Sequence, residues 1–327
     1  MRSSASTMSA IERAYVALLH GDGQQFFLYA LLLGSRLRSL DPDCARILLV
    51  ARIGSKRGSS ASEMNISCLE RYWDVQDVEM VDVPIADKSR AKRHRYVFTK
   101  LRAFQVACRK VVFLDLDVIV LRDLSDLFMV EAPAGMYHGR WNRALARHGA
   151  ELPSEAFWNY QGCINAGLLR IDPEPTDSGR KTQVTNMLMA ASDLQEDDRS
   201  YLPEQYFLVR TLKTWRHIDV RWNYEVCPRY YVDDGGRVVS LESQLHMDWI
   251  HLGRDQASLR RNVRMFHFSG TWLEPWWFLH LRSREGHDFV RRELEHRDPT
   301  GLVALAVEQW LAGMEEMRSS GVFSAEE

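Results

Sequence analysis

Apolar runs alternate with stretches of helical periodicity along the first third of the chain, and this alternation constrains the fold more than any other feature. The apolar runs predict strands over residues 15–19, 46–50, 77–83 and 110–115, and the stretches between them predict helices over residues 26–40, 62–73 and 99–109. Strands that alternate with helices form repeated βαβ units in a mostly parallel sheet. Such sheets bind ligands just beyond the carboxyl ends of their strands. This third of the chain therefore predicts a nucleotide-type α/β unit.

The pattern changes after Phe128. Residues 130–160 show little periodicity and predict loops over a second half of the domain. The elements predicted beyond them are strands over residues 163–171 and 265–268, helices over 183–191 and from 202, and a largely helical end over 283–318. No internal repeat or low-complexity linker separates these elements, which favours one large domain.

Composition excludes several classes of protein. The 327 residues carry 42 basic and 44 acidic side chains, a net charge of −2, whereas a general nucleic-acid binder needs a basic surface. The longest apolar stretch, residues 26–33, is much shorter than the roughly 20 residues that span a bilayer. The 5 cysteines form no metal-type pairs and fit reduced thiols. With a polar N-terminus that lacks a secretory signal, these features predict a cytoplasmic protein.

Two carboxylates, Asp115 and Asp117, interrupt an otherwise apolar segment over residues 113–121. A charge placed there costs several kcal/mol unless it is paired or bound to a metal. Residues i and i+2 of an extended chain point to the same face, so both carboxylates can reach one site. Two hard oxygen ligands suit Mg²⁺ or Mn²⁺, and such ions commonly complete their shell with substrate phosphates. A strand end with ordinary exposed acids is the alternative.

The pair also resembles the Asp-x-Asp motif of haloacid-dehalogenase-type phosphatases, in which the first aspartate attacks phosphorus. Two features argue against this interpretation. That motif normally lies on the first strand near the N-terminus, whereas several predicted strands and helices precede Asp115. It also usually has Thr or Val two positions after the second aspartate, where this chain has Ile119.

Six groups of residues, in the same order as in the family, resemble glycosyltransferase family 8, the glycogenin-like retaining transferases. The matching segments are 98–101, 113–128, 164–171, 203–208, 222–224, and 267–270 with 275–276. Each segment is weak alone, but six in order form a specific signal that spans about residues 15–277.

The resemblance implies an α/β GT-A fold with a mostly parallel mixed sheet. A Rossmann-like half over residues 13–128 would bind the nucleotide sugar, and residues 129–282 would form the acceptor half and complete the metal site. Residues 1–12 would be a polar tail, and residues 283–327 a C-terminal helical segment.

The resemblance also implies a metal site. Asp115 and Asp117 would chelate a divalent ion, Mn²⁺ or Mg²⁺, that bridges the diphosphate of UDP-glucose or UDP-galactose, and His267 would be the third protein ligand. Imidazole joins carboxylates well on Mn²⁺-type ions. Taken alone, a histidine between two phenylalanines is more typical of a protein core.

Further residues match the family's donor-binding positions. Lys100 would touch the phosphate or the sugar as a point charge, and Phe26 would lie against the uracil. Without the family, an exposed lysine and a core phenylalanine explain these two residues as well. The resemblance also assigns Leu19, Leu116 and Gly270 to donor binding.

Asn165, Glu204 and Gln205 match positions that face the transferred sugar, and they are the candidate catalytic residues. Relatives usually carry Asp where this chain has Glu204. Retention of configuration is compatible with double displacement or with same-face attack, and no residue is assigned as the nucleophile.

The last motif departs from the family. Relatives commonly carry Lys just before Pro-Trp, where it holds the leaving diphosphate, whereas this chain has Glu274. Another cation would have to substitute for that lysine, and the candidates are Arg254, Arg260, Arg261 and the basic segment 88–95. That segment is either a solvated loop or a lid over the donor.

The sequence thus predicts a metal-dependent retaining hexosyltransferase that acts on a UDP-sugar and an unknown hydroxyl acceptor. A turnover-deficient nucleotide-sugar or glycan-binding protein is the alternative that Glu274 motivates, and the phosphatase is a third. No nucleic-acid partner is expected. The acceptor could be a glycan, a protein or a small molecule, and the protein could form a homodimer.

Overall fold

The structure is a computed structural model of the whole chain. It describes residues 11–20, 24–51, 66–83, 95–137, 147–152, 164–193, 203–225, 230–232, 238–240, 260–268 and 302–319.

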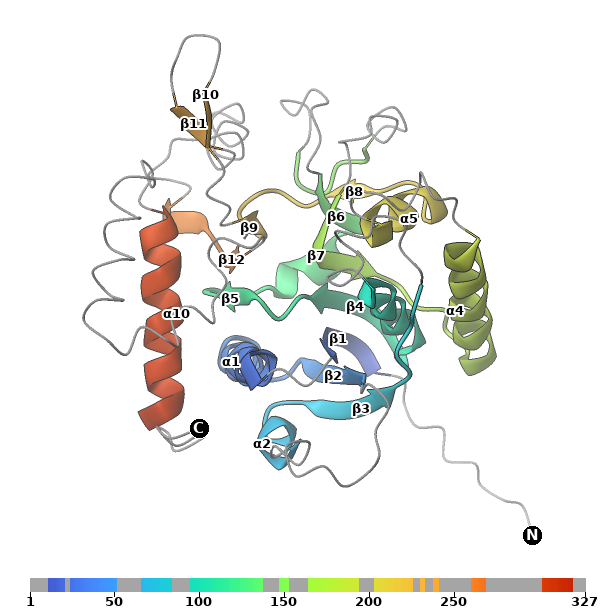
Figure 1. Cartoon of the computed structure of the whole chain (residues 1–327), viewed down its shortest axis with the longest axis horizontal. Helices are drawn as coiled ribbons and strands as arrows, with labels where there is room; N and C mark the ends of the chain where they lie inside the picture. The colour runs from blue at the N-terminus through green and yellow to red at the C-terminus, as the bar shows by residue number, and fades with distance from the viewer. Residues whose placement is uncertain are drawn as a thin grey trace.

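A seven-stranded sheet forms the centre of the molecule (Figure 1). Its strands, in sheet order, are β3 (Asp74–Val78), β2 (Ala45–Ala51), β1 (Ile11–His20), β4 (Cys108–Leu114), β7 (Ile164–Ile171), β6 (Ala134–Tyr137) and β8 (Arg216–His217). The first four strands are parallel, β7 is antiparallel to both β4 and β6, and β8 is parallel to β6. The predicted α/β class with a mostly parallel mixed sheet is confirmed.

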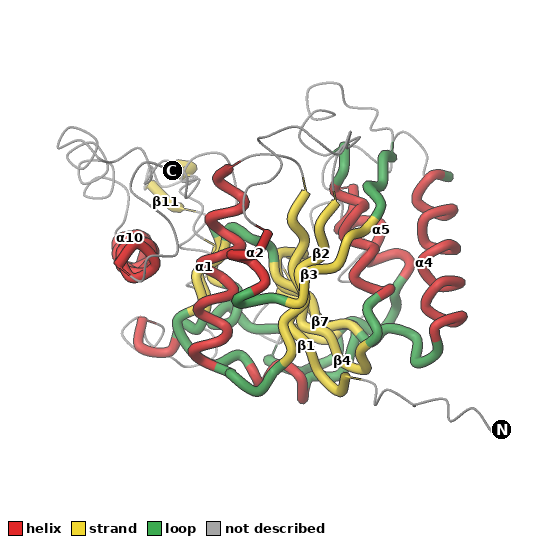
Figure 2. Tube along the Cα trace, turned by 90° about the horizontal axis from the view of Figure 1, so that it is seen from below, coloured by secondary structure: helices red, strands yellow, loops and turns green. Residues whose placement is uncertain are grey.

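Helices cover both faces of this sheet, as Figure 2 shows. The face that carries Tyr15 and Ala17 of β1 packs against α1 (Gln24–Leu40) and α10 (Leu302–Ser319). The opposite face, with Ala14 and Val16, packs against the 3-10 helix η1 (Val97–Gln105), α4 (Asp177–Ser192) and α5 (Pro203–Thr211). Strands buried on both faces read as continuous apolar runs, which is why the sequence reveals β1, β2 and β4.

A second, three-stranded sheet lies beside the first, next to α10 (Figure 1). Its order is β5 (Val118–Val120), β12 (Met265–His267) and β9 (Tyr224–Glu225). β12 is antiparallel to β5 and parallel to β9, so this sheet joins segments that are far apart in the chain.

Shorter elements complete the described part. They are α2 (Ile66–Glu70), η2 (Ser125–Met129) and the antiparallel pair β10 (Tyr230–Val232) and β11 (Val238–Ser240). Within the described residues, Cys44, Cys68 and Cys108 are free thiols. None of the helices among those residues is long and apolar enough to cross a membrane.

Several predicted elements differ from the observed ones. The strand predicted over residues 77–83 is wrong, because β3 begins at Asp74 and ends at Val78, in register with β2. Beyond it, Val81 donates its backbone N–H to the Thr99 hydroxyl instead of pairing in a sheet. The predicted tail is also too long, because Ile11 already pairs with Cys108 in the sheet.

The predicted helix over residues 99–109 is a 3-10 helix that lies two residues earlier and ends at Gln105. The chain must be extended again at Cys108 to enter β4 between β1 and β7, which leaves no room for another helical turn. At the other helices, α2 ends at Glu70 rather than at Trp73, and α4 begins at Asp177, six residues before its predicted start.

Candidate metal and donor site

The site lies where the chain leaves the carboxyl end of β4. Asp115 and Asp117 occupy a bend between β4 and β5, so the segment is not the continuous strand that the sequence suggests. β12 pairs with β5 so that His267 lies opposite Val118, and Phe268 donates its backbone N–H to the Asp117 carbonyl at 2.8 Å. Non-local strand pairing therefore places His267 beside the two carboxylates.

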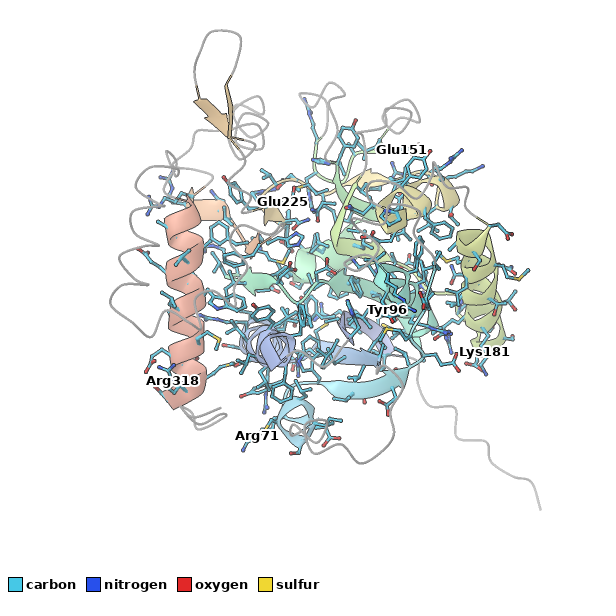
Figure 3. All side chains as sticks on the ribbon, viewed as in Figure 1. Arg71, Tyr96, Glu151, Lys181, Glu225 and Arg318 are labelled. Carbon is cyan, nitrogen blue, oxygen red and sulfur yellow. The ribbon has the colours of Figure 1, made fainter. Side chains whose placement is uncertain are left out.

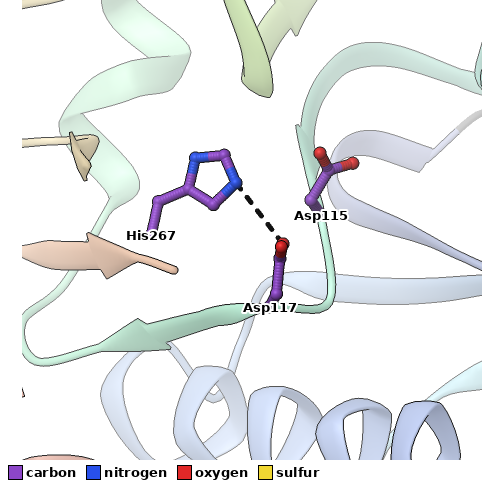
Figure 4. Close-up of side chains that lie close together, drawn as sticks. All are labelled: Asp115, Asp117 and His267. Atoms are coloured by element: carbon purple, nitrogen blue, oxygen red, sulfur yellow. Dashed lines mark ion pairs between the residues drawn. The ribbon is translucent and has the colours of Figure 1, made fainter. Parts of the chain in front are cut away.

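The three side chains lie close together (Figure 4), and one ligand atom from each lies within 4.8 Å of the others. His267 Nε2 is 3.4 Å from Asp117 Oδ1. The histidine is buried, whereas both carboxylates are partly exposed. Two carboxylate oxygens and one imidazole nitrogen on a half-open face fit a Mn²⁺-type ion that keeps positions for a phosphate ligand.

Behind the metal-facing atoms, a buried network of amides holds His267. Its Nδ1 lies 3.1 Å from Asn223 Oδ1, and Asn223 donates to Asn165 Oδ1 at 2.9 Å. Asn165 in turn donates to Glu225 Oε1 at 2.6 Å, and it accepts the N–H of Gly167 at 2.9 Å. Glu225 is the last residue of β9, and Figure 3 labels its position. Asn165 therefore supports the site, and both of its polar atoms are engaged within the protein.

Lys100 belongs to η1, which packs on the sheet face that carries Ala14 and Val16, and its side chain reaches Asp115. Its ammonium lies 2.9 Å from Asp115 Oδ1, donates to the Ala166 carbonyl at 3.0 Å and is 4.0 Å from Glu204. Burial alone would lower the pKa of Lys100, but the Asp115 and Glu204 carboxylates outweigh burial and raise it. Lys100 is therefore a positive charge held beside Asp115.

Glu204 and Gln205 lie in the first turn of α5, with Glu204 Oε1 4.0 Å from the Lys100 ammonium. Burial raises the pKa of the Glu204 carboxyl, and the Lys100 charge opposes that rise only in part. Its Oε2 atom is buried without a hydrogen-bond partner. Gln205 Oε1 accepts the N–H of Ala166 at 2.8 Å and so fixes the strand that carries Asn165.

We expect Glu204→Gln to raise the melting temperature at pH 7. Because the native pKa of Glu204 exceeds the unfolded value of about 4.3, the wild type loses stability as pH rises through that native pKa. The neutral amide of the variant carries no such penalty, so the two melting temperatures should converge toward pH 4. Thermal melts across that range measure this. Exposed Glu12→Gln is the control, and a Glu204→Gln protein that melts earlier at pH 7 would contradict the assignment.

An aromatic pair stands at the carboxyl end of β1. His20 and Phe26 stack with ring centroids 6.3 Å apart, and Phe26 is 38% exposed. Burial lowers the pKa of His20, although the Asp115 carboxylate opposes this. The side chains of Leu19 and Leu116, which the resemblance assigned to binding of the nucleotide sugar, are both buried in the core. Only their backbone atoms could contact such a ligand. The sequence left Phe26 either in the core or available to a ligand, and its ring is partly exposed rather than packed in the core.

Several predicted residues lie outside the described part of the chain. Gly270, Glu274, Arg254 and residues 88–94 belong to this group. Arg260 and Arg261 are described and exposed, and Arg95 pairs with Asp82.

The structure adds residues that sequence reasoning did not assign to the site. They are His20, Gly167, Asn223 and Glu225. Gly167 and Asn223 lie in the matched segments 164–171 and 222–224, so the resemblance covered both residues but assigned neither of them a function. His20 immediately precedes a Gly-Asp-Gly turn at the end of a predicted strand, which is where ligands bind in parallel sheets.

Comparisons of sequence identify the family. The family model described as glycosyl transferase family 8 matches residues 74–277, which is more than half of the chain. The uncharacterized protein R707 of Acanthamoeba polyphaga mimivirus is 24% identical over 86% of this chain and 98% of its own length. The inositol phosphorylceramide glucuronosyltransferase 1 of Arabidopsis thaliana is 31% identical, but over only 35% of this chain and 20% of its own length.

Solved structures show the same fold. The galactosyltransferase LgtC, solved with donor and acceptor sugar analogs, is 15% identical with a TM-score of 0.53, over 94% of this chain and 99% of LgtC. The glycosyltransferase GlyE of Streptococcus pneumoniae TIGR4 is also 15% identical with a TM-score of 0.50, over 97% of this chain and 66% of GlyE. The fold is the GT-A fold of these enzymes. By the match over residues 74–277, the chain belongs to glycosyltransferase family 8.

Proposed function

We propose that the protein is a metal-dependent, retaining hexosyltransferase that uses UDP-glucose or UDP-galactose and an unidentified hydroxyl acceptor. Family membership supports glycosyl transfer. The observation that carries the finer proposal is the convergence of Asp115, Asp117 and His267 within 4.8 Å at the carboxyl end of β4.

In this proposal, the carboxylates of Asp115 and Asp117 and Nε2 of His267 would hold the divalent ion. When bound, such an ion supplies Lewis-acid stabilisation of the diphosphate leaving group. Lys100 adds a preorganised positive charge next to Asp115, so that negative charge developing on the diphosphate meets a cation already in place. The low exposure of Lys100, 11% of its side chain, strengthens that interaction.

The remaining residues would orient the donor. Phe26 offers an exposed ring for the uracil, with His20 stacked behind it. Glu204 would lie near the transferred sugar, while Gln205 and Asn165 hold the strand beside it. Both routes to retention remain compatible with this arrangement, and we assign no nucleophile.

The phosphatase hypothesis is disfavoured by family membership and by the position of Asp115, which follows β4 rather than the first strand. The binder hypothesis is separated from the enzyme by experiment. Release of UDP from UDP-glucose and UDP-galactose, measured with Mn²⁺, with Mg²⁺ and with a chelator, should show metal-dependent turnover. Donor binding without UDP release would favour the binder, and nucleotide-independent phosphatase activity would favour the third hypothesis.

We expect His267→Ala to weaken binding of UDP with Mn²⁺ by about 10–100-fold, the usual cost of disturbing a metal site. Calorimetric titration beside a thermal melt measures this. His217→Ala is a matched control, because His217 is also buried and also bonds through Nδ1, to the Tyr137 N–H at 3.2 Å. If His267 were only a core residue, both variants would melt earlier and both would keep their affinity for the metal and UDP.

A further inference from the structure

Gly167 contacts the groups that position the proposed metal ligands, both the aspartates and the histidine. Its carbonyl accepts the backbone N–H of Asp115 at 2.8 Å, and its own N–H donates to Asn165 Oδ1 at 2.9 Å. Its missing side chain leaves room for the His267 ring, because a Cβ there would lie 2.1 Å from the ring carbon Cε1. One residue of β7 thus touches the bend that carries the aspartates, the amide network and the histidine.

The backbone N–H of Gly167 fixes the orientation of every amide that follows. A backbone N–H can only donate, so the Asn165 atom that faces it must be an oxygen. The Asn223 atom that lies 2.9 Å from this oxygen must then be the amide nitrogen. The Asn223 oxygen is left facing His267 Nδ1 at 3.1 Å, and an oxygen of that kind can only accept.

From this chain of donors and acceptors we infer that Asn223 is a positioning residue that keeps a proton on His267 Nδ1 and leaves Nε2 as the metal-binding nitrogen. The inference rests on the proposed metal-dependent function. Asn223 is fully buried beside the ring.

The position of Asp117 explains why such a residue is needed. Its carboxylate lies 3.4 Å from His267 Nε2 and would attract the single proton of a neutral imidazole to that nitrogen. A protonated Nε2 has no lone pair for a metal. The acceptor on the other side of the ring opposes this, since the hydrogen bond at one ring nitrogen sets which nitrogen carries the proton.

Two variants separate this role from simple packing. Asn223→Ala removes the acceptor, and we expect it to weaken Mn²⁺ affinity, measured with UDP present by electron paramagnetic resonance of free Mn²⁺, by about 10–100-fold. Asn223→Asp keeps an acceptor for Nδ1 but can no longer donate to Asn165. We expect it to melt earlier than the wild type and yet to keep its Mn²⁺ affinity within a few-fold.

Tyr15→Phe is the matched control. It also removes a buried hydrogen bond, the one from Tyr15 to Asp41 at 3.0 Å, but it lies outside the network. We expect lower stability and unchanged Mn²⁺ affinity. If affinity followed the melting temperature across all three variants, Asn223 would be structural and the inference would be overturned.

Side-chain ¹⁵N spectra of the wild type with Mg²⁺ and UDP read the tautomer directly, with the His267 signals assigned by their loss in His267→Gln. We expect Nδ1 to be protonated and Nε2 to carry the lone pair, and the opposite pattern would overturn the inference. A wild type that binds Mn²⁺ while Asn223→Ala binds equally well refutes this inference alone. A wild type that binds no Mn²⁺ refutes the proposed function and this inference with it.

Discussion

Replacing Asp117 or Asp115 with asparagine is expected to lower glycosyl transfer by about 10²- to 10³-fold or more, the cost of losing one preorganised electrostatic group at the reacting centre. Each variant keeps the shape of the side chain but removes a negative charge from the three-residue cluster. Metal and diphosphate binding should weaken together. Initial rates of UDP release over a range of Mn²⁺ concentrations measure the effect.

The two variants should differ in stability, which gives an internal check. Asp115 pairs with Lys100 at 2.9 Å, so Asp115→Asn leaves that buried ammonium with less compensation and should melt earlier. Asp117 instead faces His267, whose pKa it raises, and the imidazole can lose its proton when that carboxylate is removed, so Asp117→Asn should lower the melting temperature less than Asp115→Asn. Asp74→Asn, on the edge strand β3, is the control and should leave both quantities unchanged. Near-normal transfer by Asp117→Asn at saturating Mn²⁺ would contradict the metal assignment.

Gly167→Ala is the second change with a large expected effect. The added methyl would lie 2.1 Å from His267 Cε1 and 2.6 Å from its Nδ1, so the imidazole ring must move. The backbone of Gly167 cannot retreat easily, because its N–H and its carbonyl both make hydrogen bonds. We expect about 1–3 kcal/mol of destabilisation from overpacking and about 10²-fold lower transfer from a misplaced ligand.

A thermal melt and UDP release together test this expectation. Gly135→Ala is the control, since a methyl at Gly135 in the same sheet meets Ile164 Cδ1 at 3.3 Å, a contact that needs only a small adjustment. The double variant Gly167→Ala/His267→Ala removes the clashing ring and should recover stability but not activity. Such non-additivity is the signature of direct contact. A Gly167→Ala enzyme with wild-type turnover would show that His267 is not needed where it stands.

Local pattern sufficed for the parts of the fold that are buried on both faces. β1, β2 and β4 appear as apolar runs, and α1 as a helical repeat that ends at Leu40, just before Asp41 and Pro42. The local sequence pattern gave a wrong prediction where pairing with another strand decides the structure of a segment. Residues 77–83 alternate as an exposed strand would, yet their pairing with β2 ends at Val78.

The site shows the same division. Asp115 and Asp117 stand out because they interrupt an apolar segment, so their neighbours in the sequence reveal them. His267 has no such local signal, and only its pairing opposite Val118 brings it to the carboxylates. Asn223 reaches the site through β9, which pairs with β12, and hydrogen-bond direction within a buried network is not encoded in any short stretch of sequence.

The most direct measurement is anomalous diffraction at the manganese edge from crystals grown with Mn²⁺ and UDP. We expect one anomalous peak, from a manganese ion bound by a carboxylate oxygen of Asp115, a carboxylate oxygen of Asp117 and Nε2 of His267, with the UDP diphosphate completing the shell. A peak elsewhere, or UDP bound at this site with no metal between it and the two aspartates, would contradict this expectation.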